Sequence, residues 1–369
     1  MKTKAKIFAL GLLGISSLVA CTKDEIVEPI NNQPSIVGQD LSSTDIDGAY
    51  IVQLDSNFAN GTLLLATTFD DKDQAIRAEI NKWLQSHNLN IPVGFTYHSA
   101  LKGFSTQLTD QERMQLEQLP EVVRIESNIV MHVVAEREPV ANNEGQIRPY
   151  GSIITGTASG IGKLAFILDT GIDLDHQDLN VNERMSINFT QQGLVVDEFK
   201  GSDSPEDANG HGTHVAGIIG AINNNIGTVG IAHGAELVAV RVLDKEGRGA
   251  SSMVLKGLDY VAFVGLPGNV LNISLIGKGS VIVDEAVAQV ATRGVLVAIA
   301  AGNQGGDIQQ WSPARLNTEH VYTISAMDQF KSFAEFSNHG AGVDFSAPGV
   351  AVQSTYLNGQ YASMSGTSM

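Results

Sequence analysis

The stretch Leu164-Ala165-Phe166-Ile167-Leu168-Asp169 decides the fold of most of this chain. Its first five residues are apolar without alternation, which is typical of a strand buried on both faces of a parallel sheet. Four more short apolar runs follow, at residues 237–242, 270–274, 295–300 and 321–326. Amphipathic segments with helical spacing, 251–264 and 281–293, lie between some of these runs. Alternating strands and helices predict a three-layer α/β domain on a parallel sheet.

Polar residues with catalytic potential follow these runs, and in α/β sheets functional groups gather at the carboxyl ends of strands. Asp169 ends the first run, and Asn303 comes soon after the run at 295–300. Two further stretches are Asn209-Gly210-His211-Gly212-Thr213-His214 and Ser365-Gly366-Thr367-Ser368-Met369. Amide hydrolysis needs a nucleophilic hydroxyl, a base and a carboxylate that orients the base. Ser368, His211 and Asp169 are the candidates for these three roles.

These stretches resemble, in order, the Asp, His and Ser signatures of the subtilisin family of serine endopeptidases. The resemblance covers residues 145–369 and implies a subtilisin-like three-layer parallel sheet that acts on polypeptides without a catalytic cofactor. It implies that His211 is catalytic, that His214 is structural, and that Asn303 and the Ser368 amide stabilise the oxyanion. Because the family has a buried helix after the nucleophile, we expect this domain to be incomplete and residues 1–369 alone to be inactive.

Residues 47–131 have a different pattern, with strand-like segments at 50–54, 101–108 and 122–125. Helical periodicity covers 71–87, and Thr109 with Glu112 forms a capping box that opens a second helix. This order predicts a small ferredoxin-like α+β domain. The stretch Ala100-Leu101-Lys102-Gly103-Phe104-Ser105 resembles the subtilisin propeptide. The resemblance implies a self-processing zymogen inhibited by its own propeptide, with 132–144 as the processing linker.

Two segments resemble the edges between which the family binds an extended peptide. They are Ser274-Leu275-Ile276-Gly277 and Gly247-Arg248-Gly249, and Gly302 lies beside the first of them in the family's arrangement. Such binding adds the peptide as a strand between two edges. Ile276 stands where the family usually has glycine, so we expect a narrower pocket than the family's broad apolar one.

A calcium site is also implied by the resemblance. The stretch 222–228 resembles the family's calcium loop, although an Asn-rich turn can also be only a turn. Oxygen ligands with a single carboxylate suit a hard cation. The expected ligands are the side chains of Gln146, Asp178 and Asn224 and the carbonyls of Ile222, Ile226 and Thr228.

The N-terminus carries a targeting signal. Residues 1–6 are basic and 7–19 are apolar, a pattern that is typical of a secretory signal peptide at 1–20. Leu18-Val19-Ala20-Cys21 resembles a bacterial lipobox, which implies that Cys21, the sole cysteine, is lipidated. A polar tether at 21–46 would then anchor a secreted protein to the bacterial outer membrane or cell surface. A plain signal peptide with an incidental cysteine is the alternative.

Other functions are less compatible with the chain. The formal net charge of −17 argues against nucleic acid as a partner. An esterase of the α/β-hydrolase kind has its triad in the order Ser, acid, His, which is not the order here. The remaining alternative is a non-catalytic peptide-binding surface lipoprotein of the same fold. Intact Asp169, His211, Asn303 and Ser368 argue against it.

Overall fold

A seven-stranded parallel sheet forms the centre of the larger domain. The computed structural model describes residues 45–133, 135–139, 145–190 and 204–369, so the signal peptide, Cys21 and nearly all of the tether lie outside the described residues. The strand order is β17-β16-β14-β12-β7-β10-β8, and every pair is parallel. The strands are β7 Leu164–Asp169, β8 Ile187–Asn188, β10 Glu236–Arg241, β12 Val270–Ile273, β14 Leu296–Ala300, β16 Val321–Met327 and β17 Phe345–Pro348.

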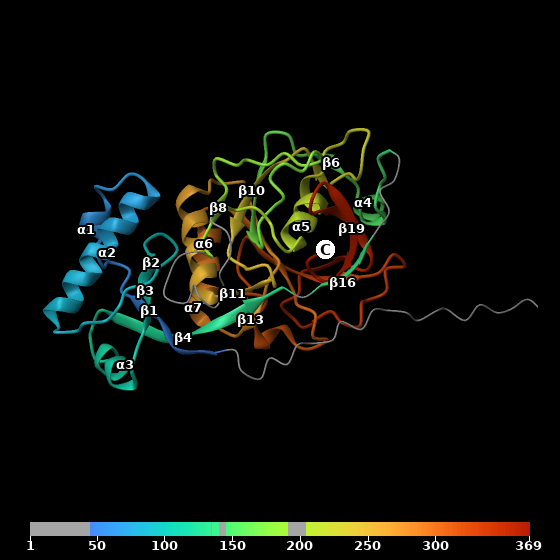
Figure 1. Cartoon of the computed structure of the whole chain (residues 1–369). Helices are drawn as coiled ribbons and strands as arrows, with labels where there is room; N and C mark the ends of the chain where they lie inside the picture. The colour runs from blue at the N-terminus through green and yellow to red at the C-terminus, as the bar shows by residue number, and fades with distance from the viewer. Residues whose placement is uncertain (1–44, 134, 140–144, 191–203) are drawn as a thin grey trace, which may run out of the picture. The chain divides into compact units, whose positions relative to one another are not determined.

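The five apolar runs are the five adjacent central strands of this sheet, from β16 to β10. They are buried because helices cover the sheet, as Figure 1 shows. The helices of this domain are α4 Tyr150–Thr155, α5 His211–Gly220, α6 Ser251–Val264 and α7 Val281–Thr292. The prediction of a three-layer α/β domain is therefore confirmed, and α6 has the predicted bounds. Only the edge strands β8 and β17 gave no clear signal in the sequence.

The smaller domain has the predicted ferredoxin-like fold. Its strands pair antiparallel in the order β4-β1-β3-β2, with helices on one side around Ile76, Ile80 and Trp83. Thr109 and Glu112 form both hydrogen bonds of the predicted capping box. The elements are β1 Asp45–Leu54, α1 Asn60–Leu63, α2 Phe69–Ser86, β2 Thr96–Tyr97, β3 Lys102–Gln107, α3 Asp110–Leu116 and β4 Val122–His132.

Strand β4 continues from the smaller domain into the larger one. Its last residues pair antiparallel with β11, Arg248–Ala250, so that the sheet order reads β11-β4-β1-β3-β2. The strand is longer than the sequence suggested, because residues 130–132 are held by β11 and not by their own domain. Helix α6 contacts β4 on one side and β7 on the other, which explains why every residue from Ser251 to Ala262 is buried.

The segment expected to be a processing linker, residues 132–144, is not wholly irregular. Within it, β5 Glu136–Pro139 pairs with β19 Gln360–Ser365, which in turn pairs with β18 Val352–Tyr356. Sequence patterns missed β5 because a four-residue edge strand has too few residues to show alternation. The remaining short elements are β6 Ala158–Ser159, β9 Ala232–His233, β13 Gly277–Lys278, η1 Ile308–Gln310 and β15 Trp311–Ser312.

The described residues all belong to one compact unit that spans residues 34–369. In this part of the chain, no helix has the length and apolar character that crossing a bilayer requires.

Candidate active site

The carboxyl end of β7 brings together two of the predicted catalytic residues. Asp169 ends that strand and His211 begins α5, and both side chains are buried. His211 Nδ1 lies 2.8 Å from Oδ1 and 2.9 Å from Oδ2 of Asp169. Among the described residues, Nε2 of His211 has no hydrogen-bond partner. The carboxylate therefore holds the proton on Nδ1 and leaves Nε2 as the acceptor, which is the tautomer that a general base needs.

Gly212 permits the close approach of α5 to β7. A Cβ atom at this position would lie 2.1 Å from the carbonyl oxygen of Gly171, a distance that no side chain can tolerate. A larger residue would therefore push the first turn of α5, and His211 with it, away from Asp169. The glycine after His211 is required by packing against the strand that carries the carboxylate.

Asp207 fixes the start of α5, and sequence reasoning missed it. One carboxylate oxygen accepts from the amides of Asn209 and Gly210 at 2.9 and 3.0 Å. The other accepts from the amide and hydroxyl of Thr213 at 3.0 and 2.7 Å. Gly210, the N-cap residue, has no side chain that could make these bonds. The available signal was an aspartate just before a helix start that lacks its own capping side chain.

His214 has the structural role that the sequence suggested. Its Nε2 lies 3.1 Å from the carbonyl oxygens of Val352 and Ala362, and the side chain is fully buried. Burial lowers the pKa of His214 to about 3. This histidine is therefore neutral at physiological pH and ties α5 to β18 and β19.

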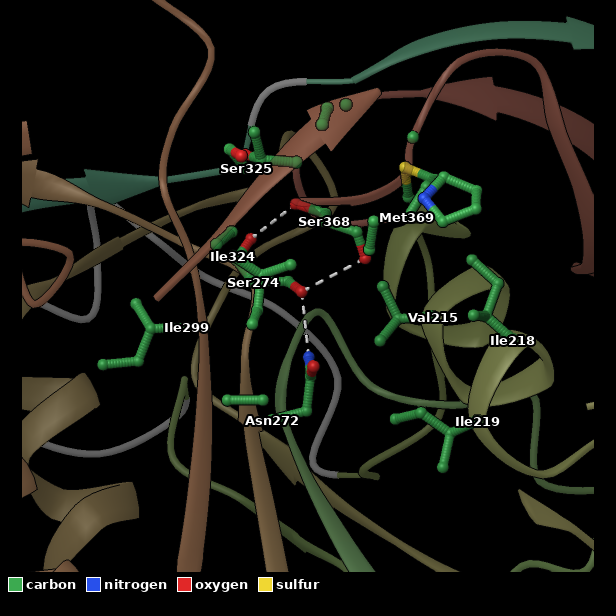
Figure 2. A pocket seen from close by; sticks show the side chains of 18 residues that line it. Val215, Ile218, Ile219, Asn272, Ser274, Ile299, Ile324, Ser325, Ser368 and Met369 are labelled. Atoms are coloured by element: carbon green, nitrogen blue, oxygen red, sulfur yellow. Dashed lines mark hydrogen bonds between the residues drawn. The ribbon is translucent and has the colours of Figure 1, made fainter. Parts of the chain in front are cut away.

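Ser368 lies at the edge of the same sheet but is not hydrogen-bonded to His211. Its hydroxyl donates to the carbonyl oxygen of Ser274 at 3.3 Å, while the Ser274 hydroxyl is bonded to Asn272 Nδ2 at 2.9 Å. Figure 2 shows this chain of bonds beside an apolar cavity of about 150 Å³. Val215, Ile218 and Ile219 of α5 form one wall of that cavity. The structure thus assembles the Asp–His pair and places the serine hydroxyl on Ser274.

Asn303 connects the loop after β14 with the segment that carries Ser368. Its Oδ1 accepts from the amide and the hydroxyl of Thr367 at 2.9 and 2.8 Å. The Thr367 hydroxyl in turn accepts from the Gly302 amide at 3.0 Å. These bonds hold the carboxamide of Asn303, the predicted oxyanion donor, next to the residue that precedes Ser368.

The end of β4 occupies the groove between the two predicted peptide-binding segments. His132 exchanges two main-chain bonds with Ile276, with N···O distances of 2.9 and 3.0 Å, and the amide of Val133 donates to Gly247 at 3.0 Å. On the other edge, Gly249 is paired with Met131. Residues of this chain therefore lie in the groove as an added strand. Sequence reasoning did not identify His132, whose buried ring nitrogens have no partner in the described structure.

Five of the six predicted calcium ligands lie together. The carbonyl oxygens of Ile222 and Thr228 and the Oδ1 atom of Asn224 point at one atom, Gln146 Nε2, at 2.7, 2.9 and 3.3 Å. Asp178 accepts from Asn224 Nδ2 at 2.8 Å, and burial raises the pKa of Asp178. For Ile226, the contact is its amide bonded to Asn224 Oδ1 at 2.8 Å. Oxygens that converge on one point are the arrangement that a hard cation requires.

The parallel sheet with a buried Asp–His pair at its carboxyl edge defines the acid–base part of a serine hydrolase. Residues 163–369 match the subtilase family, peptidase S8, and residues 49–133 match peptidase inhibitor I9. The chain therefore belongs to the subtilase family of serine endopeptidases, and residues 49–133 are its propeptide domain.

Relatives and a solved structure agree with this assignment. Subtilisin BL of Lederbergia lenta is 43% identical over 232 residues, which cover 63% of this chain and 76% of that protein. An extracellular serine proteinase of Thermus sp. is 37% identical and covers 74% of this chain and 64% of that protein. The crystal structure of a cold-adapted subtilisin-like serine proteinase matches with a TM-score of 0.51 and 34% identity, over 58% of this chain and 73% of that chain.

Proposed function

We propose that this protein cleaves peptide bonds through an Asp169–His211–Ser368 triad and processes its own propeptide. The observation that carries the proposal is the buried Asp169–His211 pair, whose Nε2 atom has no other partner among the described residues. The propeptide strand in the groove beside Ser368 supports the same proposal, because it lies where an extended substrate would lie.

The reaction begins when the Ser368 hydroxyl leaves the Ser274 carbonyl and turns to His211. Nε2 takes the proton while Oγ attacks the peptide carbonyl, and Asp169 stabilises the imidazolium that forms. The Asn303 carboxamide and the Ser368 amide receive the developing oxyanion. His211 then gives its proton to the leaving amine, and water releases the acyl group by the same steps. The acyl-enzyme divides one difficult substitution into two easier ones.

Replacement of the nucleophile tests this proposal directly. Ser368→Ala in the full-length protein should lower kcat on casein by about 10⁶-fold, the order found for subtilisin, and should leave the propeptide attached. Ser363→Ala, a half-buried serine on β19, is the matched control and should keep both activities. A Ser368→Ala protein that still digests casein and processes itself would exclude Ser368 as nucleophile. A wild type with no peptidase activity would favour the non-catalytic peptide-binding alternative.

We further propose that the Gln146–Asp178–Asn224 cluster binds a structural calcium ion. The amide oxygen and nitrogen of Gln146 exchange places by a half-turn of the side chain, which would add a fourth oxygen to the three that now surround Nε2. Chelation should lower the melting temperature of the wild type more than its initial turnover, since the cluster is separate from the catalytic pair. Asp178→Ala should remove the calcium dependence, and Glu246→Ala, on an exposed loop, should keep it. Equal wild-type melting temperatures with and without calcium would exclude the site.

Export from the cell is part of the proposal. The signal-like residues 1–20 support it, as does the extracellular serine proteinase of Thermus sp. among the relatives. We propose in addition that a lipid on Cys21 anchors the protein to the membrane. Cys21→Ser should then release the protein from the membrane fraction, and a variant that stays bound after a high-salt wash would exclude this anchor.

A further inference from the structure

The propeptide strand indicates where a substrate side chain goes, if the proposed peptidase function holds. His132 faces Ile276 in antiparallel pairing, so the residue two positions further along a bound peptide faces Ser274. In a bound substrate that residue would lie beside the Ser368 hydroxyl, which is bonded to the Ser274 carbonyl. It is therefore the acyl residue, the one whose carbonyl is attacked.

The acyl residue and His132 point to the same side of the strand, because side chains alternate with a period of two. The His132 side chain lines a cleft next to Ser368. The walls of this acyl pocket are residues 274–276 on one side and residues 300–304 on the other. The side chain of the acyl residue must enter the acyl pocket.

Ile276 closes this acyl pocket from within. A Cβ atom added to Gly302 would lie 2.8 Å from Cδ1 of Ile276, so the isoleucine side chain already reaches the opposite wall. Gly302 has a φ of 98°, which a residue with a side chain rarely adopts. With the propeptide strand in place, a space of about 10 Å³ is left, about enough for one water molecule, and His132 is among the residues that line it. Both residues of this contact, Ile276 and Gly302, belong to the peptidase domain.

The opposite wall is held rigidly and cannot move back to make room. Asn338 is fully buried, and its Nδ2 donates to the Ala301 carbonyl and to Gln304 Oε1, both at 2.9 Å. Its Oδ1 accepts from the amides of Gln304 and Gly306 at 3.0 and 2.9 Å. A wall that is hydrogen-bonded on both sides of Gly302 keeps its distance from Ile276.

We propose that Ile276 restricts this peptidase to peptide bonds that follow a small residue, namely glycine, alanine, serine or valine, the last being the residue two positions after His132 in this chain, and that it excludes leucine and the aromatic residues. A larger acyl side chain would have to displace the isoleucine from its packing against the wall at Gly302. The restriction is a property of one side chain, so it should be reversible by one substitution.

The test uses the full-length enzyme after maturation and peptides that differ only in the acyl residue: alanine, leucine or phenylalanine. In the wild type, kcat/KM for the alanine peptide should exceed that for the phenylalanine peptide by about 100-fold. Ile276→Gly should raise kcat/KM for phenylalanine by more than about tenfold and change alanine much less. Ile276→Val keeps the branched side chain and should keep the preference for alanine.

The outcomes separate this inference from the proposed function. A wild type that reacts with an active-site serine reagent but prefers phenylalanine or leucine overturns the restriction and leaves the peptidase function intact. A folded Ile276→Gly enzyme with the wild-type ratio also overturns it. No hydrolysis of any peptide overturns the peptidase function and the restriction together. If Ile276→Gly does not fold, the wild-type ratio decides the matter alone.

Discussion

The propeptide contacts the peptidase domain in two regions that differ in kind. At the tail, residues 130–133 pair with β11 and with Ile276 through main-chain atoms. At the body, side chains on and near α6 make the bonds, and Asp259 accepts from the amides of His98, Ser99 and Ala100 at 3.0, 2.6 and 2.8 Å. Main-chain pairing is open to any extended peptide, whereas the contact with Asp259 requires this propeptide. The tail contact therefore suits many substrates, and the body contact distinguishes the inhibitor from them.

The body contact is a buried charge cluster. Asp259 and Lys256 of α6 are almost fully buried, and the Lys256 ammonium donates to Asp73 and to the Thr96 carbonyl of the propeptide. Burial raises the pKa of Asp259, and the charge of Lys256 opposes that rise. A buried ion pair contributes little by itself, but removing one partner leaves the other charge without compensation. The body contact should therefore be the more sensitive of the two regions to a single substitution.

The largest effect is expected from Asp259→Ala in the Ser368→Ala protein, which cannot process itself. The substitution leaves three propeptide amides without their acceptor and removes one of the two carboxylates beside the buried Lys256 charge, and it should cost about 3–5 kcal/mol of unfolding free energy. Urea unfolding of the uncleaved protein measures this cost. Glu246→Ala, which removes an exposed ion pair with Lys245, should cost less than about 1 kcal/mol. If both substitutions lower the unfolding free energy by the same amount, the body contact does not stabilise the uncleaved protein more than an exposed ion pair does.

A smaller effect is expected at the tail, and it depends on pH. Burial lowers the pKa of His132 to about 4, whereas a free imidazole titrates near about 6.5. Between these pH values the imidazole of the released tail binds more protons than that of the docked tail. The contribution of the neutral, buried His132 to the unfolding free energy is therefore fully present above pH 6.5 and is lost as the pH falls toward 4. From pH 7 to pH 5 this loss is about 2 kcal/mol.

His132→Leu removes the titrating group and keeps an apolar side chain in the groove. The unfolding free energy of the Ser368→Ala protein should therefore fall by about 2 kcal/mol more between pH 7 and pH 5 than that of the Ser368→Ala/His132→Leu protein. If the unfolding free energies of the two proteins depend equally on pH, protonation of His132 does not destabilise the docked tail, and the predicted burial of its imidazole is wrong.

The smallest of the three effects is expected from Asn128→Ala. The Asn128 carboxamide lies on β4 and accepts from the amide of Ser252, in the first turn of α6, at 3.0 Å. Loss of a helix cap costs about 1 kcal/mol. The same urea unfolding measures it, and the half-buried Ser127→Ala is a neighbouring control. If Asn128→Ala lowers the unfolding free energy more than Asp259→Ala does, the helix cap is a stronger body contact than the buried charge cluster, contrary to this prediction.

Local patterns made much of the fold predictable from the sequence. Apolar runs without alternation predicted five strands of the sheet. The spacing of Thr109 and Glu112 predicted the exact residue at which a helix begins. Asp169 and His211 were found because each sits in a distinctive short motif. The Asp259–His98 contact was not found, since 161 residues separate partners that carry no motif and meet only after both domains form. The orientation of the Ser368 hydroxyl was equally hidden, because it depends on the Ser274 carbonyl and not on residue type.

Helix α6 starts without a capping side chain of its own, since Ala250 at its N-cap offers none. The propeptide supplies the missing acceptor through Asn128. If the proposed self-processing occurs, this acceptor leaves with the propeptide. The mature enzyme would then keep a conformation that was completed by a part it no longer contains. An unfolded mature chain has no such template with which to rebuild the start of α6. The lifetime of the mature enzyme would then be set by its rate of unfolding and not by an equilibrium between folded and unfolded states.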